Sequence, residues 1–304
     1  LLCLSTSVLG CGLRLSEPSE DAASRPKRHI IGGTNVTVPG RWPWQVYLIV
    51  MRQFMRHYTC GATVIAERWV LTAAHCIAFN NEQGPVFGTT LIAGINNSRE
   101  NKAVVPKVVK RIEYPGFNAM IANDIALLEL ETPLIYSDSV SPICLPNPSQ
   151  SIPNDGQAVT IGFGSIGVDE NGKDLPSDGQ LREVIVPIVP SDVCEERIFH
   201  TLNRTTWEEF HDAWMKKNVI CASSLAHGTH RGDSGGPLMM KASDGRWFQI
   251  GVTSTSSATD TDGYRIPNTF ADVRKFCDWI KETTGGEASC QEKEVALEDV
   301  KINP

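Results

Sequence analysis

The stretch Gly232-Asp233-Ser234-Gly235-Gly236-Pro237 is the most demanding motif in this chain. Glycines on both sides of a serine indicate an unusual backbone path that exposes the hydroxyl, because glycine adopts conformations closed to other residues. Two upstream segments also carry reactive side chains: Leu71-Thr72-Ala73-Ala74-His75-Cys76 and Asn123-Asp124-Ile125-Ala126-Leu127-Leu128. Each segment alone has an ordinary structural interpretation. In the order His, Asp, Ser, with Ile30-Ile31-Gly32-Gly33 upstream, they indicate a catalytic constellation.

Short β-branched runs surround these motifs and are separated by Gly and Pro. Regular short strands with turn signals are typical of an all-β sandwich or barrel. The predicted strands are 46–50, 69–72, 104–112, 125–130, 158–163, 184–189 and 250–253. Two stretches have helical spacing instead, 207–217 and 272–281, and the second places Val273, Phe276 and Ile280 on one face.

Composition excludes several classes of protein. The 304 residues hold 28 basic and 35 acidic side chains, a formal charge of −7, which argues against a nucleic-acid binder with a basic stripe. No apolar run approaches the roughly 18 residues that a membrane span needs. Nine cysteines are too many for a typical cytosolic enzyme and predict an oxidising compartment.

Both ends of the chain differ from its centre. Residues 1–10 are typical of the tail of a signal peptide cut before Cys11, with a short buried strand as the alternative. The signal interpretation removes Cys3 and leaves eight cysteines. Residues 11–29 are polar and are expected to be a pro-segment, while the acidic residues 285–304 are expected to form a mobile tail.

Two kinds of short motif agree with secretion. The cluster Arg25-Pro26-Lys27-Arg28 is of the kind that secretory-pathway convertases cut, although a charge run can also be a solvated face. Glycosylation sequons occur at Asn35, Asn96 and Asn203. These sequons are short enough to arise by chance, so they support secretion without establishing it.

With these motifs, the chain from Ile30 to about Lys281 resembles the chymotrypsin-like serine proteases. The resemblance implies an all-β domain over 30–284, built of two packed six-stranded antiparallel barrels that divide near 145–155, with a C-terminal helix. It implies a secreted, zymogen-type endopeptidase that hydrolyses peptide bonds through an acyl-enzyme and needs no cofactor. Its partners would be protein or peptide substrates, an activating protease and protease inhibitors. The alternative is a catalytically silent homologue that binds partners through the same fold.

The resemblance also assigns roles to individual residues. Ser234 would be the nucleophile, His75 the general base and then the acid, and Asp124 the group that orients His75. The backbone N–H groups of Gly232 and Ser234 would form the oxyanion hole. Ser254 matches the family serine that supports the buried aspartate.

The resemblance also implies activation by cleavage in front of Ile30. A new ammonium at Ile30 would bury itself against Asp233. The basic cut after Arg28 leaves His29 in front of Ile30, and one extra residue would misplace the charge of a buried ion pair. Trimming of His29, a cut directly after His29, or weak activation all remain open.

Disulfide pairing follows from the resemblance for three bridges and by elimination for the last. The alternative joins Cys144 to Cys277 or to Cys290. The expected pairs are Cys60–Cys76, Cys194–Cys221, Cys11–Cys144 and Cys277–Cys290.

The sequence departs from the family pattern at the substrate pocket. His230 occupies a position where the family usually has a cysteine, and 256–266 contains no partner cysteine; a second family bridge is lost at Ala158 and Met240. Gly228 lies where trypsin-like members carry an aspartate, so a buried Arg or Lys of the substrate would have no counter-charge. Cleavage after basic residues is therefore not expected to be the main activity. The predicted pocket residues are Gly228, Thr229, Ser254, Ser256 and Asn268.

No metal site is expected either. The stretch 95–102, which corresponds to the family's calcium loop, is short and lacks a pair of acidic ligands. Glu100 alone is insufficient for a cation that takes six or more oxygen ligands.

Overall fold

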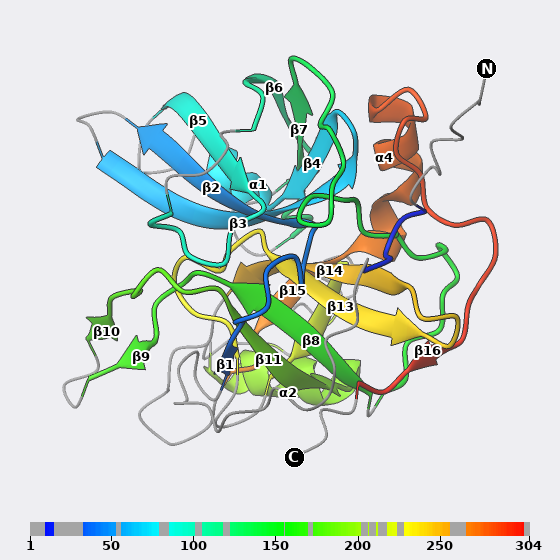
Figure 1. Cartoon of the computed structure of the whole chain (residues 1–304). Helices are drawn as coiled ribbons and strands as arrows, with labels where there is room; N and C mark the ends of the chain where they lie inside the picture. The colour runs from blue at the N-terminus through cyan, green and yellow to red at the C-terminus, as the bar shows by residue number, and fades with distance from the viewer. Residues whose placement is uncertain are drawn as a thin grey trace.

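The computed structural model of the chain describes residues 10–14, 33–52, 56–78, 85–100, 105–117, 122–154, 156–169, 173–201, 206, 211, 218–223, 228–255 and 266–300. Two β-units lie against one another, the first from the N-terminal half and the second from the C-terminal half (Figure 1). Strand predictions within the described residues hold best where apolar runs are continuous, as for 69–72, which is strand β4 (Trp69–Thr72).

The first unit is a six-stranded antiparallel sheet in the order β5-β2-β3-β4-β7-β6. Its inward face is formed by alternate residues, such as Val46, Leu48 and Val50 of β2, which are fully buried. Strands β5 and β6 share no ladder among the described residues, so this unit is a half-barrel. Besides β4, its strands are β2 (Gln45–Arg52), β3 (Arg56–Ala66), β5 (Val86–Ala93), β6 (Val108–Glu113) and β7 (Ala126–Leu130).

The second unit is a closed six-stranded barrel. Strand β8 pairs with both β11 and β13, and the ring continues through β12, β15 and β14. The expected all-β fold of two six-stranded antiparallel barrels is thereby confirmed, with the second barrel closed and the first a half-barrel among the described residues. The barrel strands are β8 (Gln157–Gly162), β11 (Arg182–Val189), β12 (Val219–Ala222), β13 (Pro237–Ala242), β14 (Trp247–Thr255) and β15 (Thr269–Asp272).

The predicted C-terminal helix is also present. A 3-10 turn, η3 (Val273–Phe276), leads into α4 (Cys277–Thr283). Edge-to-face contacts of Tyr114 with Phe276 and Trp279 dock this segment on the first unit. Figure 1 shows α4 beside that unit. No helix among the described residues is long and apolar enough to cross a membrane.

Helix α2 (Ser191–Thr201) is not among the predicted elements. The helix predicted at 207–217 lies, apart from His211, outside the described residues. The remaining short elements are α1 (Ala74–Ile77), β1 (Thr34–Asn35), β9 (Gly167–Val168), β10 (Asp174–Leu175) and β16 (Leu297–Glu298).

The tail after α4 is bound to the barrel rather than mobile up to residue 300. Cys277 and Cys290 form a disulfide, and β16 pairs with the edge of β13 through Leu297 and Glu298. The expectation of a mobile tail failed because acidic composition does not reveal the pairing of β16 with β13, which adds to the expected Cys277–Cys290 bond.

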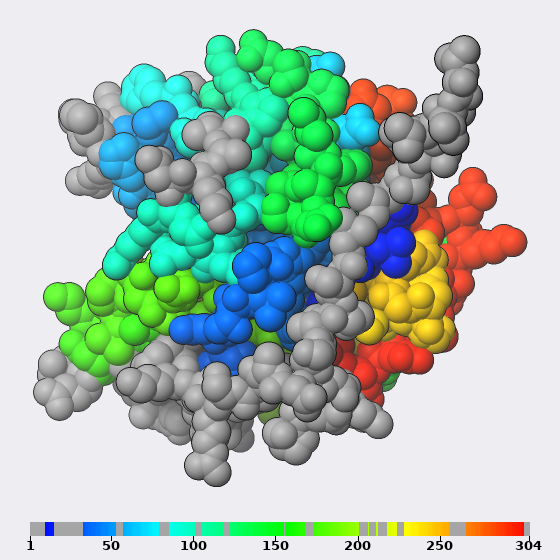
Figure 2. Space-filling model, in the orientation of Figure 1, coloured from blue at the N-terminus to red at the C-terminus, as the bar shows by residue number. Residues whose placement is uncertain are grey.

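Residues 10–14 also pack on the protein. Cys11 is bonded to Cys144, the N–H of Gly12 donates to Pro142 O (2.8 Å), and Trp247 N–H donates to Gly12 O (2.9 Å). Figure 2 shows this segment, dark blue, beside the yellow surface of the second unit. The start of the predicted pro-segment is therefore covalently held to the main fold.

The two units meet closely at two glycines. A Cβ on Gly61 of β3 would lie 2.8 Å from Cα of Gly236, so a side chain there would force the units apart. Trp44 is fully buried nearby, and its indole N–H donates to Sδ of Met239 on β13 (3.0 Å). This contact positions the first unit against the segment that carries Ser234.

Candidate active site

His75 and Asp124 are held together by two contacts. The backbone N–H of His75, on α1, donates to Oδ1 of Asp124 (2.8 Å), and Nδ1 of the His75 ring lies 2.6 Å from Oδ2. A carboxylate accepts hydrogen bonds, so this geometry places a proton on Nδ1 and makes Nε2 of the neutral ring the acceptor. Such a ring can take a proton from a hydroxyl on its Nε2 side.

The carboxylate of Asp124 has a third partner from the other unit. Ser254, on β14, donates its hydroxyl to Oδ2 of Asp124 (2.7 Å). Asp124 is 4% exposed, and burial of a charged carboxylate is tolerated when its oxygens are hydrogen-bonded. Ser254 is predicted both to support this aspartate and to line the pocket, and its hydroxyl does contact the aspartate.

The backbone before Asp124 has a conformation that asparagine tolerates. Asn123 has a φ of 55°, in the left-handed region where Asn is enriched. Its side chain donates to Gly116 O (2.9 Å) and accepts from the amide of Asn218 (2.8 Å). These contacts, which the sequence did not suggest, fix the turn that presents Asp124 to His75.

The Ser234 loop is shaped by close backbone contacts. Ser234 O accepts from the N–H of Gly61 (2.7 Å), and the N–H of Gly235 donates to Thr253 O (2.7 Å). Gly235 has a φ of +80°, and a Cβ there would lie 2.3 Å from the hydroxyl oxygen of Thr72. Only glycine therefore fits directly after the serine, and Ser234 itself is half-buried.

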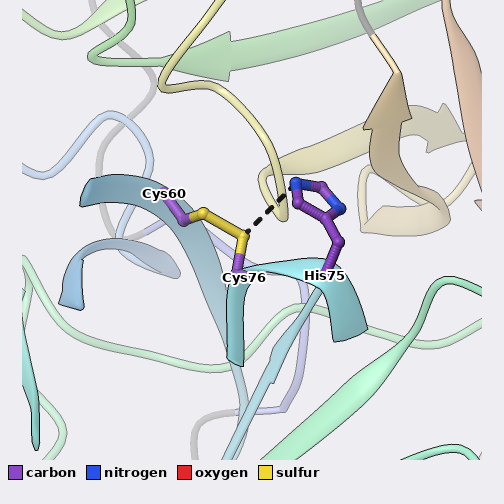
Figure 3. Close-up of side chains that lie close together, drawn as sticks. All are labelled: Cys60, His75 and Cys76. Atoms are coloured by element: carbon purple, nitrogen blue, oxygen red, sulfur yellow. Dashed lines mark hydrogen bonds between the residues drawn. A yellow bond between two sulfur atoms is a disulfide. The ribbon is translucent and has the colours of Figure 1, made fainter. Parts of the chain in front are cut away.

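One sulfur atom contacts both His75 and the Ser234 backbone. Sγ of Cys76 lies 3.8 Å from Nε2 of His75 and 3.7 Å from Ser234 O. Figure 3 shows the imidazole beside the Cys60–Cys76 disulfide. The cluster of Cys60, His75 and Cys76 is not a metal site, because both sulfurs are in that disulfide.

The electrostatics of the pair favour His75 as a base. Burial lowers the pKa of His75, but the charge and hydrogen bond of Asp124 outweigh it, and the pKa is raised above 6.5. Burial raises the pKa of Asp124, but the His75 charge and the bonds from His75 and Ser254 outweigh it, and the net pKa is lowered. Asp124 therefore stays ionised when His75 takes up a proton.

Asp233 is a buried carboxylate with backbone partners. It is 1% exposed, its Oδ1 accepts from Gly164 N–H (2.8 Å), and its Oδ2 accepts from His230 N–H (2.9 Å). Burial raises its pKa to about 6, although both backbone bonds and Arg182 lower it. Ile30, expected to supply a cation here, lies outside the described residues.

Three of the predicted pocket residues lie together. The side-chain amide of Asn268 donates to Thr229 O (3.0 Å) and to the Thr229 hydroxyl (2.7 Å). A Cβ on Gly228 would lie 2.6 Å from Oδ1 of Asn268. Asn268 thus occupies the space directly next to Gly228, while Ser256 lies outside the described residues.

A cavity of about 420 Å³ opens between the two units on the side of Arg231. Part of its wall comes from Tyr47, Ile49 and Thr59 of the first unit. Phe163, Ser165 and Arg231 of the second unit contribute another part. Thr59 also borders Gly232, where a Cβ would lie 3.3 Å from the Thr59 hydroxyl oxygen, so the cavity adjoins the Ser234 loop.

The four bridges of the structure have the expected pairings: Cys11–Cys144, Cys60–Cys76, Cys194–Cys221 and Cys277–Cys290. Of the sequons, Asn35 is exposed on β1, whereas the side-chain amide of Asn96 donates to Val38 O (2.9 Å). Asn203 and Cys3 lie outside the described residues.

Comparison with known proteins agrees with this geometry. Residues 30–280 match the family described as Trypsin. Proproteinase E of Bos taurus is 32% identical over 267 residues, covering 86% of this chain and 96% of the relative. A solved structure described as "Structure of GrC" has a TM-score of 0.66 at 25% identity, over 84% of this chain and 99% of that one. The chain belongs to the trypsin family of chymotrypsin-like serine proteases.

Proposed function

We propose that this protein is a secreted serine endopeptidase, made as a zymogen, whose catalytic residues are His75, Asp124 and Ser234. The observation that carries the proposal is the set of contacts on Asp124, which accepts from His75 twice and from Ser254. A surface aspartate needs no such set of partners. A histidine held in one tautomer by a buried carboxylate is what nucleophilic catalysis by serine requires.

In the proposed mechanism, Nε2 of His75 accepts the Ser234 proton as Oγ attacks the scissile carbonyl. Asp124 stabilises the imidazolium that forms, and His75 then protonates the leaving amine. A water molecule then attacks the acyl-enzyme, again with His75 as base and then as acid, and this hydrolysis releases Ser234. The N–H groups of Gly232 and Ser234 would bind the oxyanion, a contribution of about 3–4 kcal/mol per donor in comparable enzymes.

The pocket favours an uncharged residue before the scissile bond. Gly228 supplies no carboxylate, and Asn268, held by Thr229, takes up space beside it. An Arg or Lys side chain there would lose its hydration without gaining an acidic partner. We propose that the enzyme does not cleave mainly after basic residues.

Secretion and activation complete the proposal. The four disulfides agree with an oxidising compartment. The Cys11–Cys144 bridge would keep the 11–29 pro-segment attached after a cut in front of Ile30. Asp233, buried with backbone partners, would then receive the new ammonium of Ile30.

Labelling with a fluorophosphonate tests the proposal. Protein cleaved in front of Ile30 should be labelled on Ser234, whereas the His75→Ala variant and uncleaved protein should react far more slowly. N-terminal sequencing of the active material would identify the cut. Failure of cleaved wild-type protein to react would instead support the silent homologue that binds partners.

A further inference from the structure

The polar residue His230 occupies the position where the resemblance implies a disulfide cysteine. Its side chain is buried, with 8% exposed, and Nδ1 lies 2.5 Å from Oγ of Ser165 and 3.7 Å from Oδ1 of Asp174. Ser165 follows β8, and Asp174 begins β10, so both partners lie far from His230 in sequence. A buried polar side chain with two polar neighbours replaces a covalent link at this position.

The same carboxylate also contacts the next residue of the loop. Oδ2 of Asp174 lies 2.8 Å from Nε of Arg231. The backbone adds a further link, because Ser165 N–H donates to Arg231 O (2.7 Å). Ser165 and Asp174 therefore contact two consecutive residues that lead directly into the motif of Ser234.

Gly232 lies immediately after these contacts and has little space to move. Its φ is +97°, and a Cβ there would lie 3.0 Å from Cα of Gly164. On its other side, Asp233 N–H donates to His230 O (3.0 Å), and the Asp233 carboxylate accepts from His230 and Gly164. Residues 230 and 231 on one side and Asp233 on the other therefore restrict the backbone of Gly232.

We propose that His230, Arg231, Ser165 and Asp174 form a noncovalent clasp that positions the Gly232 N–H for the oxyanion. This inference rests on the proposed function, because it gives the clasp a role in that reaction. None of the four side chains needs to touch the reacting atoms, so they are positioning residues. The clasp replaces a pocket disulfide by holding the loop through a buried imidazole and a shared carboxylate.

Three substitutions at two positions test the clasp, and each position has a matched control elsewhere. His230→Leu removes the polar ring, and His230→Asn restores a polar atom near the position of Nδ1. Asp174→Asn weakens both contacts of the carboxylate, and Asp174 is accessible enough, at 31%, for that variant to fold. His200→Leu on α2 and Asp244→Asn, whose carboxylate pairs with Arg246 (2.8 Å), are the controls.

The measurement is kcat and KM on a peptide ester, together with the second-order rate of fluorophosphonate labelling, for protein cleaved in front of Ile30. His230→Leu should lower kcat and the labelling rate about 10- to 100-fold with KM within about threefold, because a misplaced donor acts on the transition state. His230→Asn should recover most of that loss. Asp174→Asn should lose about three- to tenfold, and both controls should match wild type.

The outcomes separate this inference from the proposed function. Wild-type protein that is not labelled overturns both. Labelled wild-type protein with Asp174→Asn and His230→Leu equal to their controls overturns the clasp alone. A rise in KM at unchanged kcat, or no recovery in His230→Asn, also overturns it, because packing rather than donor positioning would then explain the loss.

Discussion

Asp124 receives two hydrogen-bonding groups of the same residue, the backbone N–H of His75 at Oδ1 (2.8 Å) and its ring Nδ1 at Oδ2 (2.6 Å). This double contact fixes both the position of the His75 backbone and the tilt of its ring. A rotation of the imidazole about its Cβ would break the ring contact without releasing the backbone. The arrangement therefore specifies one tautomer and one orientation of the ring, and the proposed mechanism depends on both.

Replacing Asp124 with Asn should reduce kcat without comparable change in KM. The Asn amide can accept at one atom only, so it would favour the other tautomer of His75 or leave an N–H unpaired. We expect a loss on the order of 10³–10⁴-fold in kcat for cleaved protein on a peptide ester. Asp138→Asn, at an exposed loop position, is the control, and a loss below tenfold in Asp124→Asn would contradict the assigned role.

Activity should fall at low pH with a midpoint above the ordinary histidine value. In the proposed mechanism the neutral form of His75 is the base, and the Asp124 carboxylate raises the pKa of His75 above 6.5. Protonation therefore removes the base as pH falls through that raised pKa. The acid limb of the pH profile of kcat/KM measures the pKa of His75 in the free enzyme. A midpoint at or below 6.5 would show that Asp124 does not stabilise the imidazolium.

The sequence pattern predicts strands at β2, β4, β6, β7, β8, β11 and β14, but not at β3, β5, β12, β13 or β15. Strand β3 illustrates the reason. Its centre, Cys60-Gly61-Ala62, has low β-propensity, and the strand forms because it pairs with β2 on one side and β4 on the other. Helix α2 did carry a weak signal, since Cys194 and Ile198 are buried four residues apart. Patterns in a single sequence do not show the packing and strand pairing from distant residues that stabilise β3 and α2.

At the candidate site, residues that lie in sequence motifs could be predicted, whereas contacts made by residues outside those motifs could not. His75, Asp124 and Ser234 each lie in a recognisable segment, and the structure brings the His75 ring and the Ser234 backbone to one sulfur. The contact of His230 with Ser165 spans 65 positions and follows no local rule. It could be found only from the packing of the loop against the segment after β8.

The contribution of Asp233 to the stability of the uncleaved chain should fall as pH rises from about 4 to about 7. Burial raises the folded-state pKa of Asp233 from 3.8 to about 6, so the folded state keeps a proton that the unfolded state releases. Its stabilising contribution is present below pH 3.8 and is lost as pH rises through about 6, on the order of 3 kcal/mol. Denaturant unfolding at both ends of this range, in a Ser234→Ala background to prevent proteolysis, measures the loss. Asp233→Asn should remove most of the difference, and an unchanged slope in that variant would assign it to other groups.

Specificity should not be converted to cleavage after Arg by one substitution in the pocket. A Cβ at residue 228 would lie 2.6 Å from Oδ1 of Asn268, so Gly228→Asp introduces both a steric conflict and a carboxylate beside an amide oxygen. We expect that single variant to lose activity on all substrates.

Gly228→Asp combined with Asn268→Gly should cleave after Arg at least about tenfold faster than either single variant, because the second change provides room and the first a buried counter-charge. Chromogenic peptides that differ only in the residue before the scissile bond give the comparison, and Asn268→Gly alone controls for a wider pocket without charge. Strong cleavage after Arg by the wild-type protein, or by Gly228→Asp alone, would show that Asn268 does not limit the pocket.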